Sequence, residues 1–314
     1  MILNSDIAQN YNFINYISGL GVFDGALCKM INLIISILCS VSVGVLFKYI
    51  KARTSVNILL ITINYLCAVI ATYISFRPEI NISSIAYDHY TILLSVLLPS
   101  VFILLSLSIH YSGIIRTDIA QRISLVIPIA CSYWIFNESI SWFRWVGLAT
   151  GFISLFFILS KSQKSNGNNS IYLLFVFIGY GVIDVLFKQV ALQKNIPYTT
   201  ALFYIFCGSF IFSLMITAVS LFKKKLIVQK STIFYGVLLG LFNFLNIYFY
   251  LKAHQSFAKN PTTVFATMNF GVILLATLIG AFYFKEKLSR KNILGLILAV
   301  IAILFVVISQ AEQL

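Results

Sequence analysis

Charged residues are scarce in this 314-residue chain: they make up 10% of it, and only nine residues are acidic. Soluble domains carry about 25% charged residues. Hydrophobic residues account for 60% of the chain, and the mean hydropathy is +0.96. The scarcity of charge excludes a soluble globular protein and predicts an integral membrane protein.

Metal-binding and catalytic motifs are also missing from the sequence. The five cysteines form no Cys-x-x-Cys pair, and the three histidines have no metal-binding spacing. There is no His-Glu-x-x-His, no Gly-x-Ser-x-Gly and no Gly-x-x-x-x-Gly-Lys-Ser/Thr loop. We therefore expect no metal, no cofactor and no ATP-driven pump, and an integral membrane enzyme is the less favoured alternative class.

Long apolar runs dominate the rest of the chain. A membrane-spanning helix needs roughly 17 to 25 apolar residues, and the alternating polarity of barrel strands is not visible. The polar segment 1–28 carries Asp6 and Asp24 and lacks a basic start, so we expect no cleaved signal peptide. Ten helical spans are predicted, near residues 31–49, 56–76, 91–111, 114–136, 143–160, 170–190, 199–221, 232–251, 262–284 and 292–309.

Positive charge exceeds negative charge, with 22 Lys and Arg residues and a net charge of +13. Most of these residues fall in short connections between the predicted spans, 15 at one face of the membrane and 7 at the other. Membrane proteins concentrate Lys and Arg on the cytoplasmic side. We therefore expect no nucleic-acid partner, and we expect the richer face to be cytoplasmic, with both termini outside.

The two halves of the chain repeat one another. Gly44-Val-Leu-Phe-Lys48 recurs as Asp184-Val-Leu-Phe-Lys188, at an offset of 140 residues. An odd number of spans in each half makes equivalent helices cross the membrane in opposite directions. The sequence thus predicts an all-α membrane protein of two inverted five-helix repeats, 29–162 and 168–310. Two further matches have an offset of 148: Phe136-Asn-Glu138 with Phe284-Lys-Glu286, and Gly147-Leu148 with Gly295-Leu296.

With these features the chain resembles the EamA branch of the drug/metabolite transporter superfamily, whose members have two five-helix repeats. The resemblance rests on the helix count, on Ala120-Gln-Arg122-Ile-Ser-Leu-Val-Ile-Pro128 in the fourth span, and on the closing motifs at Glu138 and Glu286. It implies a secondary transporter of the bacterial inner membrane that exports a small metabolite such as an amino acid, working by alternating access at a central cavity. A flippase for a lipid or lipid-linked carrier is the alternative.

Two acidic residues fall within predicted spans, where an ionisable side chain costs roughly 2.5 to 3.5 kcal/mol. Asp184 lies four residues before Lys188, and Asp118 lies four before Arg122, the spacing of helical ion pairs. The first pair either neutralises itself within the membrane or serves coupling and gating, possible proton coupling included. Arg122 either pairs with Asp118 or binds a carboxylate or phosphate of the solute.

Polar side chains on one face of span eight are candidates for binding the solute. Asn243, Asn246 and Tyr250 follow the spacing i, i+3, i+7 in a helix otherwise rich in Leu, Phe and Ile. In lipid they would lack hydrogen-bond partners, so they face protein or a cavity. Interhelical hydrogen bonding is the alternative role. Weaker candidates are Asn64 and Tyr65 in span two and Thr263, Thr267 and Asn269 in span nine.

The remaining expectations are structural. Glu138 and Glu286 close spans beside Arg144 and Lys287, and we expect solvated ion pairs that contribute little. Pro99 and Pro128 lie inside spans three and four, and each is expected to bend its helix, because proline removes a backbone donor. The expected partners are a small-molecule solute and membrane lipid, and we expect a monomer or weak homo-oligomer.

Overall fold

The computed structural model describes residues 30–47, 49–50, 58–78, 88–159, 171–222, 230–283, 285 and 288–311, and within them it contains helices and no strand. The predicted N-terminal polar segment, Glu286 and Lys287 lie outside the described residues. The helices are Met30–Phe47, α2 (Ile58–Phe76), α4 (His89–Ser112), α5 (Ile114–Ile123), α6 (Val126–Trp134), α7 (Trp142–Leu159), α8 (Ile171–Leu192), α9 (Tyr198–Phe222), α10 (Lys230–Ser256), α11 (Pro261–Phe282) and α12 (Arg290–Ala311).

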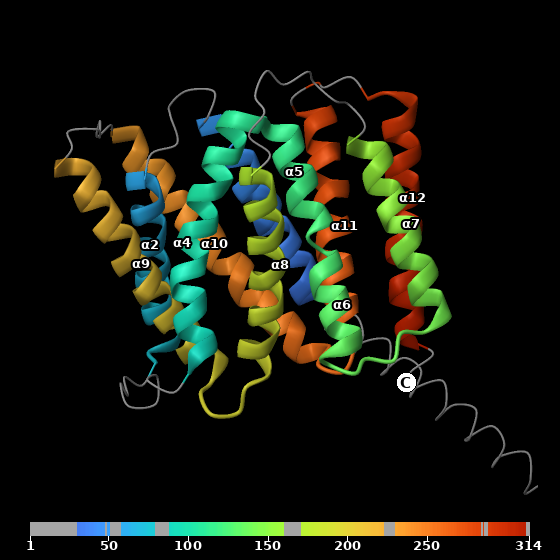
Figure 1. Cartoon of the computed structure of the whole chain (residues 1–314), viewed down its shortest axis with the longest axis horizontal. Coiled ribbons are helices and arrows are strands. Elements are labelled where there is room, and N and C mark those ends of the chain that lie inside the picture. The colour runs from blue at the N-terminus through green and yellow to red at the C-terminus, as the bar shows by residue number, and fades with distance from the viewer. Residues whose placement is uncertain are drawn as a thin grey trace, which may run out of the picture.

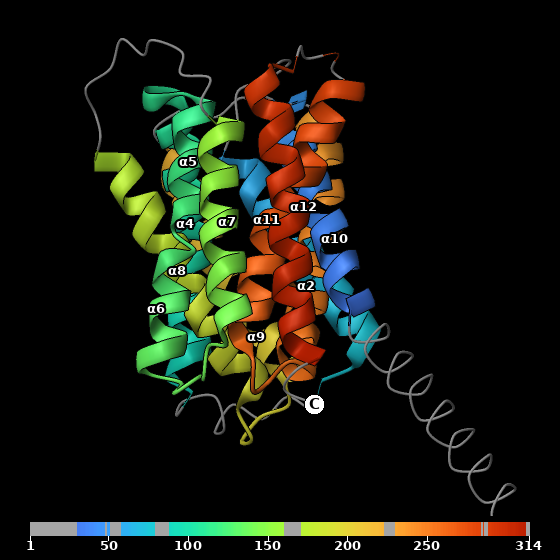
Figure 2. The ribbon, with the colours of Figure 1, turned by 90° about the vertical axis from the view of Figure 1, so that its right-hand side faces the viewer.

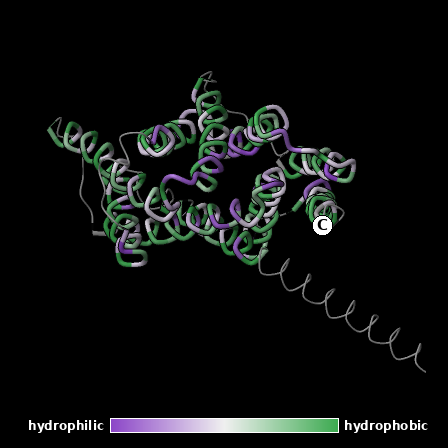
Figure 3. The backbone as a smooth tube through the Cα atoms, turned by 90° about the horizontal axis from the view of Figure 1, so that it is seen from below, coloured by the Kyte–Doolittle hydropathy of each residue, from purple (hydrophilic) through white to green (hydrophobic). Residues whose placement is uncertain are grey.

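Among these helices, eight are long and apolar enough to cross a membrane: all except α5, α6 and α7. Large hydrophobic side chains cover their outer faces, such as Phe222, Phe234 and Phe282. Figure 3 shows the hydrophobic character along most of each helix. An apolar exterior of this kind suits lipid rather than water, which confirms the prediction of an integral, all-helical membrane protein.

The fourth predicted span is broken into α5 and α6 at Ser124 and Leu125. Pro128 has no N–H to donate to the carbonyl of Ser124, and that carbonyl accepts a tighter bond from Ile127 N at 2.9 Å. The break therefore has the cause that the sequence predicted.

With α5 and α6 counted as one span, the spans alternate in direction along the chain, as Figure 1 shows. Here "upper" is the edge where α4 ends and α12 begins, and "lower" is the edge where α6 ends and α11 begins. In both views α7 lies beside α12, and Figure 2 shows this pair from the side. At the other side α2 packs against α9 and α10, with α4 and α8 between the two groups. The packing leaves polar residues of α5, α8, α10 and α11 facing the interior.

Candidate functional site

A cavity of about 1140 Å³ lies among the helix Met30–Phe47, α4, α5, α8, α10 and α11. Its lining reaches His110 near the upper end of α4 and Gly280 near the upper end of α11. On the lower side the lining stops at Tyr250 and at Met268, which is seven residues into α11. At 1.5 Å per residue, about 10 Å of α11 lies below the cavity. The cavity therefore extends from mid-membrane depth to the upper edge.

Most of the residues that the sequence singled out line this cavity. The residues it brings together are Asn243, Asn246, Tyr250, Arg122, Asn269, Asp118 and Asp184. Five others are buried but do not line it: Asn64, Tyr65, Thr263, Thr267 and Lys188. The polar face of α10 and the charged residues of α5 thus line the same cavity.

Asp184 is bound by a neighbouring helix rather than by Lys188. The Tyr250 hydroxyl on α10 donates a hydrogen bond to Asp184 Oδ1 at 2.9 Å. The ion pairs found in the described part of the chain join Arg122 to Asp118 and Arg144 to Glu138. The predicted ion pair between Asp184 and Lys188 was therefore wrong, because tertiary partners compete with the i, i+4 spacing.

Lys188 takes part in a different contact, below the cavity. Its Nζ lies 2.9 Å from the centroid of the Phe136 ring, at the end of α6, and its side chain is buried. An ammonium held over an aromatic face gains a cation–π attraction that strengthens when water is excluded. This contact joins α8 of the C-terminal half to the N-terminal half.

The upper part of the cavity carries the opposite charge to Asp184. Arg122 Nε lies 3.4 Å from Asp118 Oδ1, so the predicted pair on α5 does form, and both residues still line the cavity. Arg122 is also within electrostatic range of Asp184. The cavity therefore offers an acidic and a basic group to one ligand, with the base nearer the upper edge.

Internal hydrogen bonds involve the side-chain amides of Asn246 and Asn269. Ser36 Oγ lies 2.9 Å from Asn246 Oδ1 and 3.0 Å from the Asn246 carbonyl oxygen, and the Asn246 NH₂ group is a donor that can face the cavity. Asn269 uses its NH₂ group on the carbonyl of Phe265, at 3.1 Å, which leaves its oxygen as an acceptor. The site can therefore bind both donor and acceptor groups of a solute.

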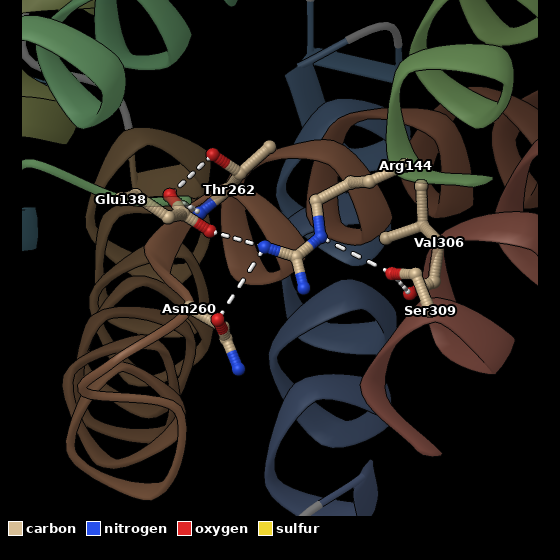
Figure 4. Close-up of polar contacts among 6 residues, drawn as sticks. All are labelled: Glu138, Arg144, Asn260, Thr262, Val306 and Ser309. Atoms are coloured by element: carbon tan, nitrogen blue, oxygen red, sulfur yellow. Dashed lines mark hydrogen bonds and ion pairs between the residues drawn. The ribbon is translucent and has the colours of Figure 1, made fainter. Parts of the chain in front are cut away.

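A buried network that we call the lower lock lies at the lower edge (Figure 4). It consists of Glu138, Arg144, Asn260, Thr262 and Ser309. Arg144 is 0% exposed, and its NH1 lies 2.6 Å from Glu138 Oε1. Burial raises the pKa of the Glu138 carboxyl, while hydrogen bonds from Thr262 and the charge of Arg144 oppose that rise. The expectation of a solvated pair was wrong, because α11 and α12 cover it.

The lower lock joins the two halves of the chain. Glu138 Oε2 accepts hydrogen bonds from Thr262 N at 3.1 Å and Thr262 Oγ1 at 2.5 Å. Arg144 donates to Ser309 Oγ at 3.1 Å and to Asn260 Oδ1 at 3.4 Å. A paired and hydrogen-bonded charge can be stable when buried, and it becomes costly as soon as one partner leaves.

Several site residues were not anticipated from the sequence. Tyr180 lines the cavity one helical turn before Asp184, a spacing that marks the same face of α8. His254 lies within α10, two residues before its end, and is 0% exposed. Ser36 and the lower lock act through partners more than 100 residues away, and no local pattern identifies them.

The fold and the cavity define a helical membrane protein with a polar chamber inside it. The profile of the EamA-like transporter family matches residues 169–308. This chain belongs to the EamA family of the drug/metabolite transporter superfamily. Membership indicates an integral membrane transporter of small molecules rather than an enzyme.

Individual relatives support this assignment. An uncharacterized protein of Haemophilus influenzae is 40% identical over 285 residues, which cover 87% of this chain and 96% of that protein. An S-adenosylmethionine uptake transporter of Rickettsia prowazekii is 23% identical over 197 residues, covering 62% of this chain and 64% of the relative. A protein crystal structure superposes with a TM-score of 0.70 at 12% identity, covering 91% of this chain and 98% of that one, and so supports the fold alone.

Proposed function

We propose that this protein is a secondary transporter that exports a zwitterionic metabolite, such as an amino acid, across the bacterial inner membrane. The observation that carries the proposal is the presence of Asp184 and Arg122 in one cavity. A carboxylate attracts an ammonium group, and a guanidinium binds a carboxylate through two parallel hydrogen bonds. Asn246 and Asn269 supply a donor and an acceptor between these charges.

The cavity has room for more than a small amino acid. Its volume of about 1140 Å³ is at the upper end of ligand pockets, which span about 300 to 1,000 Å³. The rickettsial relatives are named for S-adenosylmethionine, a molecule that contains an amino-acid group. Amino acids and larger metabolites that carry this group are therefore the first solutes to test.

Alternating access requires two related halves, and we propose that residues 29–162 and 168–310 are inverted repeats. In α7, a Cβ on Gly147 would meet Ala302 O and Val306; in α12, a Cβ on Gly295 would meet Ser154 O and Ile158. The pairs Gly147 and Gly295, Ser154 and Ala302, and Ile158 and Val306 are each 148 positions apart. Reciprocal contacts of this kind, together with opposite helix directions, support a pseudo-twofold axis between α7 and α12.

Backbone conformation supports the same repeat. Asn137 has φ 49° and Lys285 has φ 52°, and these two residues are again 148 positions apart. A left-handed backbone is uncommon for residues other than glycine. Its occurrence at both span-closing motifs is expected if the two motifs are copies of one structural unit.

The direction of access supports export. The cavity reaches the upper edge, where Arg116, Arg290 and Lys291 lie at helix ends. We take this edge as cytoplasmic because the Lys-rich and Arg-rich connections belong to it in the sequence. A cavity open to the cytoplasm can load a solute for export, with Asp184 as the proposed coupling carboxylate and Asp118 and Lys188 as gating residues.

Flux into proteoliposomes tests the proposal. Purified protein is reconstituted and tested with radiolabelled amino acids, S-adenosylmethionine and lipid-linked sugars, with and without a proton gradient. We expect saturable flux of a zwitterion, inhibited by other zwitterions that share its charged groups. Flux of none of the zwitterions, or movement of the lipid-linked carriers instead, would overturn it.

Asn246 and Asn64 form a matched pair of variants. Asn246→Ala removes a donor from the cavity, and we expect the apparent affinity for solute to fall about tenfold, because a net hydrogen bond contributes about 0.5 to 1.5 kcal/mol. Asn64 is buried but does not line the cavity, so Asn64→Ala should leave the affinity unchanged. The concentration dependence of flux distinguishes them. Equal losses of affinity in both variants would show that Asn246 acts through packing alone.

A further inference from the structure

His254 is a buried ionisable side chain that the transport site does not use. It lies two residues before the end of α10 and is 0% exposed. The Tyr250 ring covers one side at a centroid distance of 4.7 Å, and the Phe265 ring of α11 covers another at 4.8 Å. Neither ring nitrogen has a hydrogen-bond partner among the described residues. Such buried polar atoms are rare and call for an explanation.

The charged side chains near His254 lie mainly on α8. On α8, the ammonium of Lys188 is within electrostatic range of the His254 ring. Asp184, also on α8, accepts a hydrogen bond from the Tyr250 hydroxyl, and the Tyr250 ring packs against His254. Glu138 is within electrostatic range of Lys188 from below. The other helices packed against α10, namely Met30–Phe47, α2, α9 and α11, contain no charged side chain, and α10 itself carries Lys252 two residues before His254. A proton on His254 would therefore face a nearby cation in an apolar enclosure.

This enclosure belongs to the seal that closes the lower edge. Phe265 is on the same helix as Thr262, which binds Glu138 of the lower lock, and Lys188 covers the Phe136 ring just before Glu138. If α11 moves away from α6 and α10 when the lower edge opens, the bonds from Thr262 to Glu138 and the contact between Phe265 and His254 separate together. His254 then exchanges the Phe265 ring for water.

We propose that His254 is a proton-binding site that becomes accessible only when the lower edge opens. This inference builds on the alternating access of the proposed function and requires no knowledge of the solute. A ligand that binds one of two states favours that state. Protons therefore favour the state that is open at the lower edge.

Proton linkage sets the size of the effect. An ordinary histidine with a pKa of about 6.5 gives an approximately tenfold shift in the equilibrium between pH 7.5 and pH 5.5, provided that the sealed state binds no proton. The ratio of open to sealed molecules should therefore rise about tenfold on acidification.

Spin-label distances in lipid nanodiscs test this inference without a solute. Labels are placed at Ser139→Cys and Ala258→Cys, two exposed positions on opposite halves at the lower edge, after replacement of the native cysteines. Wild-type His254 should give a longer-distance population that grows about tenfold relative to the shorter one between pH 7.5 and pH 5.5. His254→Gln and His254→Phe should remove this growth.

A second histidine variant is the control. His89 is an exposed residue at the lower end of α4, so His89→Gln should respond to pH as the wild type does. A constant distance ratio in the wild type would overturn the proposal. So would a pH response that persists in both His254 variants, because it would then arise from Glu138 or Lys188. Failure of solute flux with an intact pH response would instead count against the proposed transport function.

Discussion

Replacement of Arg144 by methionine is expected to destabilise the protein by about 3 to 5 kcal/mol, the usual cost of removing one partner from a buried ion pair. The cost arises because Glu138 would remain buried without its cationic partner. Methionine keeps much of the arginine side-chain volume, so the loss of charge dominates. Unfolding of the detergent-solubilised protein by denaturant measures the change.

The double variant Glu138→Gln with Arg144→Met separates charge from packing. Because neither side chain is then charged, we expect it to recover most of the stability lost by Arg144→Met. If Arg144→Met alone were as stable as the wild type, the pair would have to be hydrated, and the lower lock as described would not exist. Equal destabilisation by the single and double variants would point to lost packing.

Replacement of Asp184 by asparagine is expected to weaken transport more than any other change in the cavity. Asparagine can still accept a hydrogen bond from Tyr250, so the local geometry is kept while the negative charge is lost. A hydrogen bond to a charged group contributes about 1.5 to 3 kcal/mol, which corresponds to about a ten- to hundredfold loss of apparent affinity. Flux at varied solute concentration measures this loss.

Asp88→Asn is the matched control for Asp184→Asn. Asp88 caps the N-terminus of α4, where asparagine is as effective as aspartate, and it does not line the cavity. Its flux should equal that of the wild type. Unchanged affinity in Asp184→Asn would remove the ammonium-binding role that we propose for this carboxylate.

The sequence predicted the eight helices of the described residues that can cross a membrane, because each one is a long apolar run. It also predicted a bend at Pro128, where the fourth span is broken, since the loss of the Pro128 N–H is a local property. The same argument applied to Pro99, yet α4 continues through that residue as one helix. The polar face of α10 was visible because Asn243, Asn246 and Tyr250 follow helical periodicity. The sequence therefore predicted that these three residues share one face of α10, which lines the cavity.

What the sequence could not predict depends on contacts between distant segments. Glu138 and Arg144 lie in a polar link that reads as surface, and only α11 and α12 bury it. Asp184 and Lys188 have ideal spacing for an ion pair, yet Tyr250 and Phe136 bind them instead. Local periodicity identifies which residues share a face, whereas the partner that each one chooses is decided by packing.

Opposed movement of the two membrane edges is the central claim, and two spin-label pairs measure it most directly. One pair joins Ser139→Cys to Ala258→Cys at the lower edge, and the other joins Arg116→Cys to Phe282→Cys at the upper edge. Thr262→Val and Ser309→Ala remove bonds between the halves from the lower lock. In this background we expect the lower distance to lengthen and the upper distance to shorten. Distances that lengthen together, or a lower edge that opens while the upper edge stays unchanged, would contradict alternating access.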